Sequence, residues 1–402
     1  MTHINRAIAV LLTVMTLTVC VAVFYQFDQL WRKPLGPELA LPTYTPPRPT
    51  RTTQSTQNTQ SAPSSPVATP RLPAPTNTRI PHGPTITPPI IVVEREKPYC
   101  GGPHQMTLLA IGSDTRTVGY LYGLADVIRL IRIDFTVPRV SVLEFPRDLW
   151  VEIPEVADHH NITHGKLNQA YLYGNPGMGY YTGPGQGPGL LARTLDLNFG
   201  ARPDYYIAAN MLTFTRLIDV IGGVDVNLPY VVDARKSDQG ERYDLYFSEG
   251  HHHLTGQQAL MLARIRTKDT FHRADQQNRV LCAVRDALLQ PQNITKLPEI
   301  IDTFDGVIQT DLSPQQLSQL ACLVPKLEPR NISFITFPRE HMQESRTFDI
   351  GVNKDVYILK PDFEALRGYV ESFNTGNWPN PLALPTSAGT ALPPGEGSFS
   401  CR

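Results

Sequence analysis

Several features that would assign a function directly are missing from this sequence of 402 residues. Neither sign of charge is in excess, because 36 lysines and arginines stand against 37 aspartates and glutamates. Such a chain lacks the positive field of nucleic-acid-binding proteins, so we expect no nucleic-acid partner. The five cysteines contain no Cys-x-x-Cys pair typical of zinc or redox sites. The Gly-x-Ser-x-Gly motif of serine hydrolases and internal repeats are also absent.

Four of the cysteines lie outside the apolar N-terminal run, namely Cys100, Cys282, Cys322 and Cys401. An even number in an exported domain permits two disulfides, although spacing alone does not determine which cysteines pair. Because Cys282 and Cys322 both fall on predicted helices, we favour a bond between them. Cys100 and Cys401 would then join the two ends of the domain. The alternative is that all four are buried free thiols, as expected if the domain is cytosolic.

The N-terminal run Ala7–Tyr25 carries no charge. At about 1.5 Å per residue, a helix of this length nearly spans a hydrocarbon core of about 30 Å. A cleaved signal peptide is the alternative, but it would have a shorter apolar core and a small-x-small cleavage site, and bulky residues follow here. We therefore predict a short tail at residues 1–6 and a transmembrane anchor at residues 7–27.

Proline is concentrated before residue 100. From Pro34 to Pro89 there are 15 prolines in 56 residues, mixed with threonine, serine and glutamine. Apolar side chains are too few to offset the entropy of ordering, so residues 28–93 are predicted to be a disordered stalk or an ordinary flexible linker. Residues 374–402 have a similar composition and are predicted to be a flexible tail. The stalk and the cysteines favour a single-pass membrane protein with an extracytoplasmic domain.

The remaining residues, 94–373, are numerous enough to form one core. Short β-rich runs predict strands at Met106–Ile111, Val127–Phe135, Arg139–Phe145, Tyr205–Ala208, Val224–Leu228 and Ser333–Phe337. Amphipathic runs predict helices at Met211–Ile221, Thr255–Ala263, Arg273–Leu289, Leu297–Phe304, Ser313–Val324 and Pro361–Phe373. The second and third strands are close enough in sequence to form a hairpin. This mixture predicts an α/β fold, a three-layer α/β/α sandwich with a mixed central sheet.

Two aspartates border the predicted strands. Asp114 follows the first strand, and Asp126 precedes the second. Strand ends beside tight turns are where α/β sheets present groups to ligands. A pair of carboxylates there could hold Mg²⁺, with pyrophosphate oxygens and water completing the octahedron. For a single aspartate, turn hydrogen bonding would be the preferred interpretation.

Arginines mark two further places. Pro146 ends a strand and directs Arg147 out of it, where a guanidinium group could bind phosphate oxygens through two hydrogen bonds. The alternative is a surface pair with Asp148, which would contribute little. Arg264, Arg266 and Arg273 lie near one junction between helices, and they would repel one another unless an anion lay between them. Gln277 follows Arg273 by one helical turn.

Two other motifs have weaker interpretations. The run His251-His252-His253 could bind metal, but consecutive side chains point in different directions, so a zinc site is disfavoured. Gly183 to Gly189 is rich in glycine, yet its prolines remove backbone donors that a phosphate-binding loop needs. We interpret this segment as an ordinary loop.

The order of these motifs over residues 108–289 resembles the LytR-CpsA-Psr family. The resemblance is carried by Gly112-Ser113-Asp114, Ala125-Asp126, Pro146-Arg147-Asp148, Lys166-Leu167-Asn168-Gln169-Ala170-Tyr171, Ile218-Asp219-Val220-Ile221-Gly222-Gly223-Val224, Gly250 to Leu260, Arg264-x-Arg266, and Arg273 with Gln277. Each motif alone is weak. Their order and spacing behind one N-terminal anchor make the match specific.

The resemblance implies an enzyme that moves a glycan phosphate from a polyprenyl-pyrophosphate carrier to a cell-wall polymer. Its implied metal ligands for Mg²⁺ are Asp114 and Asp126, and its implied catalytic residues are Arg147 and Asp148. The implied pyrophosphate-binding residues are Arg147, Arg264, Arg266, Arg273 and Gln277. The carrier lipid would lie in an apolar tunnel between the sheet and the helices. Phosphoryl transfer by positioning and charge stabilisation is compatible with such residues.

The sequence departs from the family pattern at two arginine positions, which hold Leu124 and Gln276. The loss of two positive charges raises the alternative of a catalytically impaired protein that only binds polyprenyl phosphate or wall glycan.

Overall fold

The structure is a computed structural model, and it describes residues 25–26, 28–41, 97–115, 119–233, 235, 246–265, 270–294, 307–378 and 399–401. Across these ranges, no helix combines the length and apolarity needed to cross a membrane. The predicted anchor lies outside the described residues except for its last few positions, as do most of the predicted stalk and the predicted helix Leu297–Phe304.

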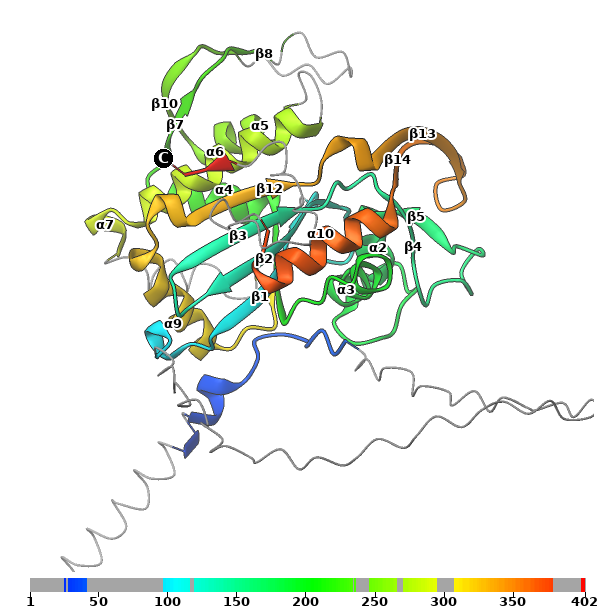
Figure 1. Cartoon of the computed structure of the whole chain (residues 1–402), viewed down its shortest axis with the longest axis horizontal. Helices are drawn as coiled ribbons and strands as arrows, with labels where there is room; N and C mark the ends of the chain where they lie inside the picture. The colour runs from blue at the N-terminus through cyan, green and yellow to red at the C-terminus, as the bar shows by residue number, and fades with distance from the viewer. Residues whose placement is uncertain are drawn as a thin grey trace, which may run out of the picture. The chain divides into compact units, whose positions relative to one another are not determined.

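A central sheet runs in the order β11-β6-β1-β2-β3-β12-β15 (Figure 1). β1 is parallel to β6 and β3 is parallel to β12, whereas the other neighbours are antiparallel. The mixed α/β fold with a mixed central sheet is therefore confirmed. The bounds of these strands are β1 Gln105–Ser113, β2 Ala125–Asp134, β3 Arg139–Glu144, β6 Tyr205–Asn210, β11 Gln309–Thr310, β12 Ile332–Thr336 and β15 Phe399–Ser400.

The hairpin between β2 and β3 forms where the sequence predicts it. Asp134 pairs with Arg139 in the register of the two strands. The Asp134 carboxylate accepts hydrogen bonds from the backbone N–H groups of Thr136 and Val137, at 2.9 and 3.0 Å. An aspartate that binds the backbone just ahead of it stabilises a turn, so this side chain fixes the register of the hairpin.

Helices cover both faces of the sheet (Figure 1). One face carries α2 Leu167–Gly174, α3 Gln186–Phe199 and α10 Phe363–Thr375. The other carries α4 Met211–Val220, α5 Gly256–Arg264, α6 Thr270–Leu288, α7 Pro291–Ile294 and α9 Pro314–Leu323. The α4, α5, α6, α9 and α10 helices correspond to predicted helices, with ends that differ by a few residues.

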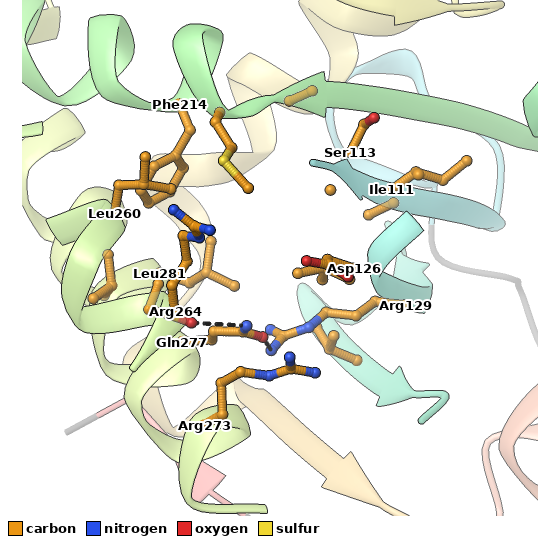
Figure 2. Close-up of a pocket in the computed structure, with 18 of the residues that line it drawn as sticks. Ile111, Ser113, Asp126, Arg129, Phe214, Leu260, Arg264, Arg273, Gln277 and Leu281 are labelled. Atoms are coloured by element: carbon orange, nitrogen blue, oxygen red, sulfur yellow. Dashed lines mark hydrogen bonds between the residues drawn. The ribbon is translucent and has the colours of Figure 1, made fainter. Parts of the chain in front are cut away.

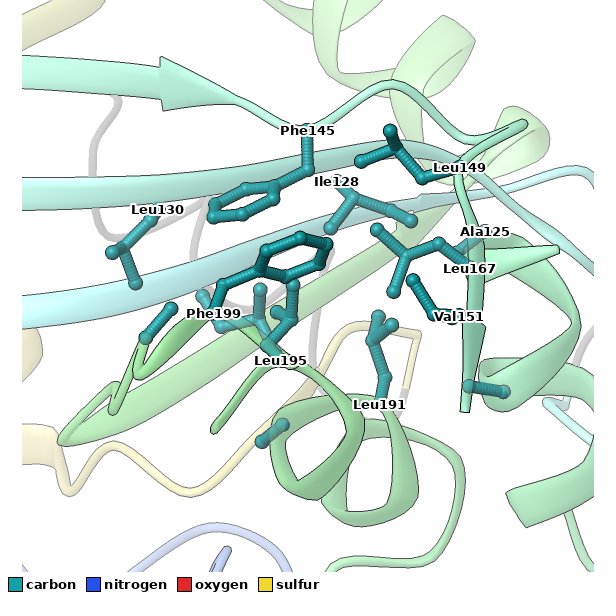
Figure 3. Packing of buried hydrophobic residues seen from close by; sticks show 14 of the residues in the cluster. Ala125, Ile128, Leu130, Phe145, Leu149, Val151, Leu167, Leu191, Leu195 and Phe199 are labelled. Atoms are coloured by element: carbon teal, nitrogen blue, oxygen red, sulfur yellow. The ribbon is translucent and has the colours of Figure 1, made fainter. Parts of the chain in front are cut away.

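The first face holds a large apolar core, drawn in Figure 3. Ile128 and Leu130 of β2 and Phe145 at the end of β3 pack there against Leu195 and Phe199 of α3. Because side chains alternate along a strand, the intervening residues of β2 project to the opposite face, where the candidate site lies.

The glycine-rich segment Gly183–Gly189 is not the loop that we predicted, because α3 begins at Gln186. Proline is tolerated in the first turn of a helix, where its missing N–H would have no partner. The glycines serve close packing: a Cβ on Gly187 would lie only 2.2 Å from Asn175 Oδ1 and 2.9 Å from Tyr171 O.

Short paired strands extend from this frame. They are β4 Trp150–Glu152 with β5 His164–Lys166, β7 Val224–Leu228 with β10 Gly250–Leu254, β8 Val232–Asp233 with β9 Tyr246–Phe247, and β13 Met342–Asp349 with β14 Lys354–Pro361. The strand β7 was predicted. The hairpin of β13 and β14 was not, because its exposed residues give a weak apolar pattern.

Both predicted disulfide pairings are wrong. Cys100 bonds Cys322, with Cα atoms 5.8 Å apart, and Cys282 bonds Cys401, with Cα atoms 5.5 Å apart. The reason is tertiary: α9 packs against the short helix Tyr99–Gly101 that contains Cys100, while Cys401 directly follows the edge strand β15. The location of two cysteines on helices says nothing about which helices face each other.

The ends of the predicted stalk and tail are more ordered than composition suggested. Leu39, within the predicted stalk, is buried in the core, and its N–H is 3.4 Å from the Asp311 carboxylate. In the predicted flexible tail, α10 continues to Thr375 and Trp378 stacks in the core against Phe337. These segments are held to the folded domain by single large apolar side chains and by one cysteine. The average composition of a segment does not reveal such single anchoring residues.

Candidate functional site

A cavity of about 800 Å³ lies between the sheet and the helices α4, α5 and α6. Its walls are mainly apolar, from both the sheet and the helices. Six of the site residues proposed from the sequence line it, namely Asp114, Asp126, Arg147, Arg264, Arg273 and Gln277. Figure 2 shows Asp126 and Arg129 projecting into this space from β2, and Arg264, Arg273 and Gln277 from α5 and α6. Folding therefore gathers distant charged groups beside an apolar surface.

The two aspartates come from adjacent antiparallel strands. Ser113 of β1 pairs with Ala125 of β2, and Gly112 pairs with Val127, so Asp126 is the extra residue of a β-bulge. Bulges redirect side chains and are frequent beside active sites. Asp114 continues from the end of β1, and its Oδ1 accepts the N–H of Leu124 at 2.7 Å. The turn interaction considered for Asp114 is therefore present, together with its position on the cavity.

Arg147 follows the end of β3 and reaches back to the bulge. Its Nη1 donates to Asp126 Oδ1 in a short contact, and its Nε lies 3.4 Å from Asp148 Oδ2. Burial alone would lower the pKa of Arg147, but the carboxylates of Asp126 and Asp148 outweigh it and raise that pKa. A guanidinium group with a raised pKa stays charged at any physiological pH, which suits it to bind anions.

Asp148 is not among the described residues that line the cavity. Its carboxylate is held between Arg147 and Lys166, whose Nζ lies 2.7 Å from Asp148 Oδ1. This geometry places the Asp148 carboxylate where it can orient Arg147, and the catalytic role expected for Asp148 stays a prediction. Lys166 was part of the motif that suggested the family, but its contact with Asp148 could not be read from the sequence.

The junction between α5 and α6 supplies the remaining groups. Arg264 is the last residue of α5, and Arg273 lies in α6. Both the nitrogen and the oxygen of the Gln277 amide form hydrogen bonds: Nε2 donates to Ala263 O at 3.1 Å, and Oε1 accepts from Arg129 at 3.1 Å. Arg266 lies outside the described residues.

Gln276, at one of the two altered family positions, is buried away from the cavity. With its amide oriented to donate, its nitrogen lies 2.9 Å from Leu262 O and 3.1 Å from Ile265 O. It therefore satisfies carbonyl groups at the end of α5, where intrahelical partners are lacking.

The sequence interpretation missed Arg129, which also lines the cavity. The available signal was a charged residue on the face of β2 that also carries Val127 and Ile131. The zinc alternative at His251–His253 gains no support: His253 Nδ1 lies 2.9 Å from Asp225 Oδ1, and no metal-holding cluster of three His, Cys, Asp or Glu side chains occurs among the described residues.

The fold and the site define a mixed α/β protein with a cationic and acidic group beside an apolar cavity. The model of the LytR_cpsA_psr family matches residues 95–362, well over half of the chain, and the protein belongs to this family. The regulatory protein MsrR of Staphylococcus aureus (strain COL) is 24% identical over 260 residues, which cover 64% of this chain and 70% of MsrR.

A second relative is the polyisoprenyl-teichoic acid–peptidoglycan teichoic acid transferase TagU of Oceanobacillus iheyensis. It is 32% identical over 219 residues, which cover 54% of this chain and 61% of TagU. Among solved structures, the crystal structure of B. subtilis TagV superposes with a TM-score of 0.52 at 21% identity, covering 68% of this chain and 97% of TagV. The structural likeness establishes the shared fold.

Proposed function

We propose that the protein is a membrane-anchored, extracytoplasmic phosphotransferase that moves a glycan phosphate from a polyprenyl-pyrophosphate carrier to a cell-wall polymer. The observation that carries this proposal is the meeting of Asp114, Asp126, Arg147, Arg264 and Arg273 at one apolar cavity. A polyprenyl-pyrophosphate donor has a charged pyrophosphate and a long hydrocarbon chain. Its binding site therefore needs charged side chains next to an apolar surface. The name of TagU describes a transfer of this class, from a polyisoprenyl carrier to peptidoglycan.

The transfer follows from the chemistry of the donor. A hydroxyl oxygen of the acceptor attacks the phosphorus atom that carries the glycan, and a new P–O bond forms. The bond from that phosphorus to the bridging oxygen breaks, and its electron pair leaves with polyprenyl phosphate. The hydroxyl proton passes to a carboxylate of the site. The arginines bind the phosphate oxygens and the charge that develops on the leaving group, which is the main contribution a protein makes to phosphoryl transfer.

The carboxylates of Asp114 and Asp126 have the chemistry that Mg²⁺ requires. Mg²⁺ in proteins commonly takes one or two carboxylates and completes its octahedron with water and phosphate oxygens. Only one oxygen of Asp126 contacts Arg147, and the bulge places this carboxylate beside the end of β1. When bound, Mg²⁺ would neutralise charge on the pyrophosphate.

The proposal is tested with the full chain in detergent, a polyprenyl-pyrophosphate glycan and Mg²⁺. Release of polyprenyl phosphate is measured for wild type and for Arg147→Ala. We expect the variant to lose at least about a hundredfold in rate, as when one charge-stabilising donor is removed from an active site. Arg330→Ala is the matched control, because Arg330 is exposed and does not line the cavity. Unchanged turnover in Arg147→Ala would contradict the proposed site.

The second candidate is a protein that binds the carrier without turnover. It is favoured by Leu124 and Gln276, which bring no charge to family arginine positions, and by the engaged amide of Gln277. Stable binding of polyprenyl pyrophosphate with no product from any donor, in the assay above, would support this candidate over the enzyme.

A further inference from the structure

Arg129 is a charged residue among apolar side chains of the cavity wall. On the cavity side of β2 it stands between Val127 and Ile131, and the neighbouring strand β3 contributes Val140 and Val142 to the same wall. The Arg129 residue is only 2% exposed. Burial of a guanidinium group is unfavourable unless its charge and its N–H groups are matched by partners.

The partners of Arg129 are too few for its donors. Nη2 donates to Glu144 Oε2 at 2.9 Å and to Gln277 Oε1 at 3.1 Å. Nε and Nη1 are buried and have no hydrogen-bond partner. A guanidinium group carries five N–H donors, three of them on these two atoms. A charged donor buried without an acceptor is costly, and it indicates a missing anionic or polar partner.

A second guanidinium group lies in the same part of the cavity. Figure 2 shows Arg273 pointing from α6 into the part of the cavity that Arg129 and Gln277 occupy. Arg273 is also buried, and Glu144 is the carboxylate bonded to Arg129. An anion with several oxygen acceptors would satisfy the unused Nε and Nη1 donors of Arg129.

We infer that Arg129 is an anion-binding residue of this cavity, which contacts the pyrophosphate of the carrier from the sheet side. The inference rests on the proposed function for the identity of the anion. Arg129 supplies a cation from the middle of β2, whereas the altered family positions Leu124 and Gln276 supply none. Its three unused N–H donors need no rearrangement to bind phosphate, whereas the Gln277 amide already donates one N–H to Ala263 O.

The alternative role of Arg129 is purely structural, as half of a buried ion pair with Glu144. A buried ion pair is often replaceable by apolar residues of similar size without loss of stability, whereas removal of one partner alone leaves an uncompensated charge. The double variant Arg129→Met/Glu144→Leu therefore removes the guanidinium group while leaving no orphaned carboxylate. The single variant Glu144→Gln is the matched control, since it retains Arg129 and an acceptor for Nη2.

The experiment measures binding of geranylgeranyl pyrophosphate and of the uncharged alcohol geranylgeraniol to the full chain in detergent, with thermal unfolding as the test of folding. We expect the double variant to bind the pyrophosphate about tenfold to a hundredfold more weakly, the range for hydrogen bonds to charged groups. Binding of the alcohol should not change. Glu144→Gln should bind the pyrophosphate at least as tightly as wild type does.

Equal affinity of the folded double variant and wild type for the pyrophosphate would overturn the inference. If the double variant does not fold, Arg129→Gln/Glu144→Gln decides, because it removes both charges and leaves a neutral hydrogen-bonding pair; wild-type affinity in that variant would overturn the inference as well. Separate turnover measurements distinguish the two proposals. Wild-type binding without transfer would contradict the enzyme and leave Arg129 in place, whereas normal transfer by the Arg129 variants would contradict only the role of Arg129.

Discussion

The disulfide between Cys282 and Cys401 should matter for binding as well as for stability. Cys282 lies in α6, the helix that also carries Arg273 and Gln277. Cys401 follows β15, which pairs with β12, and β12 contributes Ile332 and Phe334 to the cavity wall. The bond therefore ties the helix with the proposed anion-binding groups to the opposite wall of the cavity.

The size of the effect on stability can be worked from loop length. The two cysteines are 119 residues apart. The chain-entropy relation gives about 5 kcal/mol for a loop of this length, and measured values are usually about 2–4 kcal/mol. The second disulfide provides a matched control: Cys100 and Cys322 are 222 residues apart, for which the same relation again gives about 5 kcal/mol.

The two disulfides differ in their relation to the cavity. In the described part of the chain, neither the Tyr99–Gly101 helix nor α9, which the Cys100–Cys322 bond joins, contributes a residue to the cavity lining. We compare Cys282→Ser/Cys401→Ser with Cys100→Ser/Cys322→Ser under oxidising conditions. Both should unfold roughly 5–10 °C below wild type.

Only the first pair should also weaken pyrophosphate binding in the folded protein, by about tenfold or more, because displacements of about 1 Å in positioning groups are costly. Isothermal titration with geranylgeranyl pyrophosphate well below the melting temperature measures this. Equal losses of affinity in both variants would show that the effect is global. Wild-type affinity in Cys282→Ser/Cys401→Ser would refute the positioning role of the disulfide.

Two further predictions concern carboxylates. Burial raises the pKa of Asp311 to about 6, although its oxygens accept the N–H groups of Tyr206 and Leu39. The Asp311 carboxyl group therefore holds its proton more tightly in the folded state than in the unfolded state. Its contribution to the free energy of unfolding is fully present below about pH 4 and is lost as the pH rises through about 6. The loss amounts to up to about 3 kcal/mol. Thermal unfolding of Asp311→Asn should lack this pH dependence, and an unchanged pH profile would contradict the assignment. In the transfer assay, higher Mg²⁺ should partly restore Asp114→Asn but not Asp126→Asn, because Asp126 also orients Arg147; equal rescue of both would exclude that second role.

The sequence was most informative where one physical pattern dominates. The alternation along β2 and β3 and the turn residue Asp134 determine their hairpin locally, so it could be predicted. The helix α2 was missed because seven of its eight residues are buried, which removes the amphipathic pattern. The start of α3 was missed because its glycines reflect contact with a neighbouring helix. Likewise, which cysteines pair depends on tertiary contacts that no local pattern records.

For the candidate site, the chemistry of single residues was easier to predict than their contacts. The aspartates and arginines were proposed because strand ends and helix junctions present such groups to ligands, and six of the proposed residues line one cavity. Their roles in binding Mg²⁺ and pyrophosphate remain predictions. No feature of the sequence distinguishes the role of Asp148 from that of Arg147, because the contacts of its carboxylate with Arg147 and Lys166 depend on the fold. Arg129 was overlooked because a strand interior is not where ligand groups are usually sought.

The β-bulge at Asp126 connects the fold with the proposed chemistry. Without the extra residue, strict alternation would place the side chains of residues 126 and 128 on the same face, and Ile128 is in the core on the opposite side from the cavity. The bulge breaks this rule at one position, so β2 contributes Asp126 to the cavity and still buries Ile128 beneath it. Asp126 can then contact Arg147 from the neighbouring strand end. One irregularity in the sheet therefore brings a carboxylate and a guanidinium group from different strands into contact at the cavity.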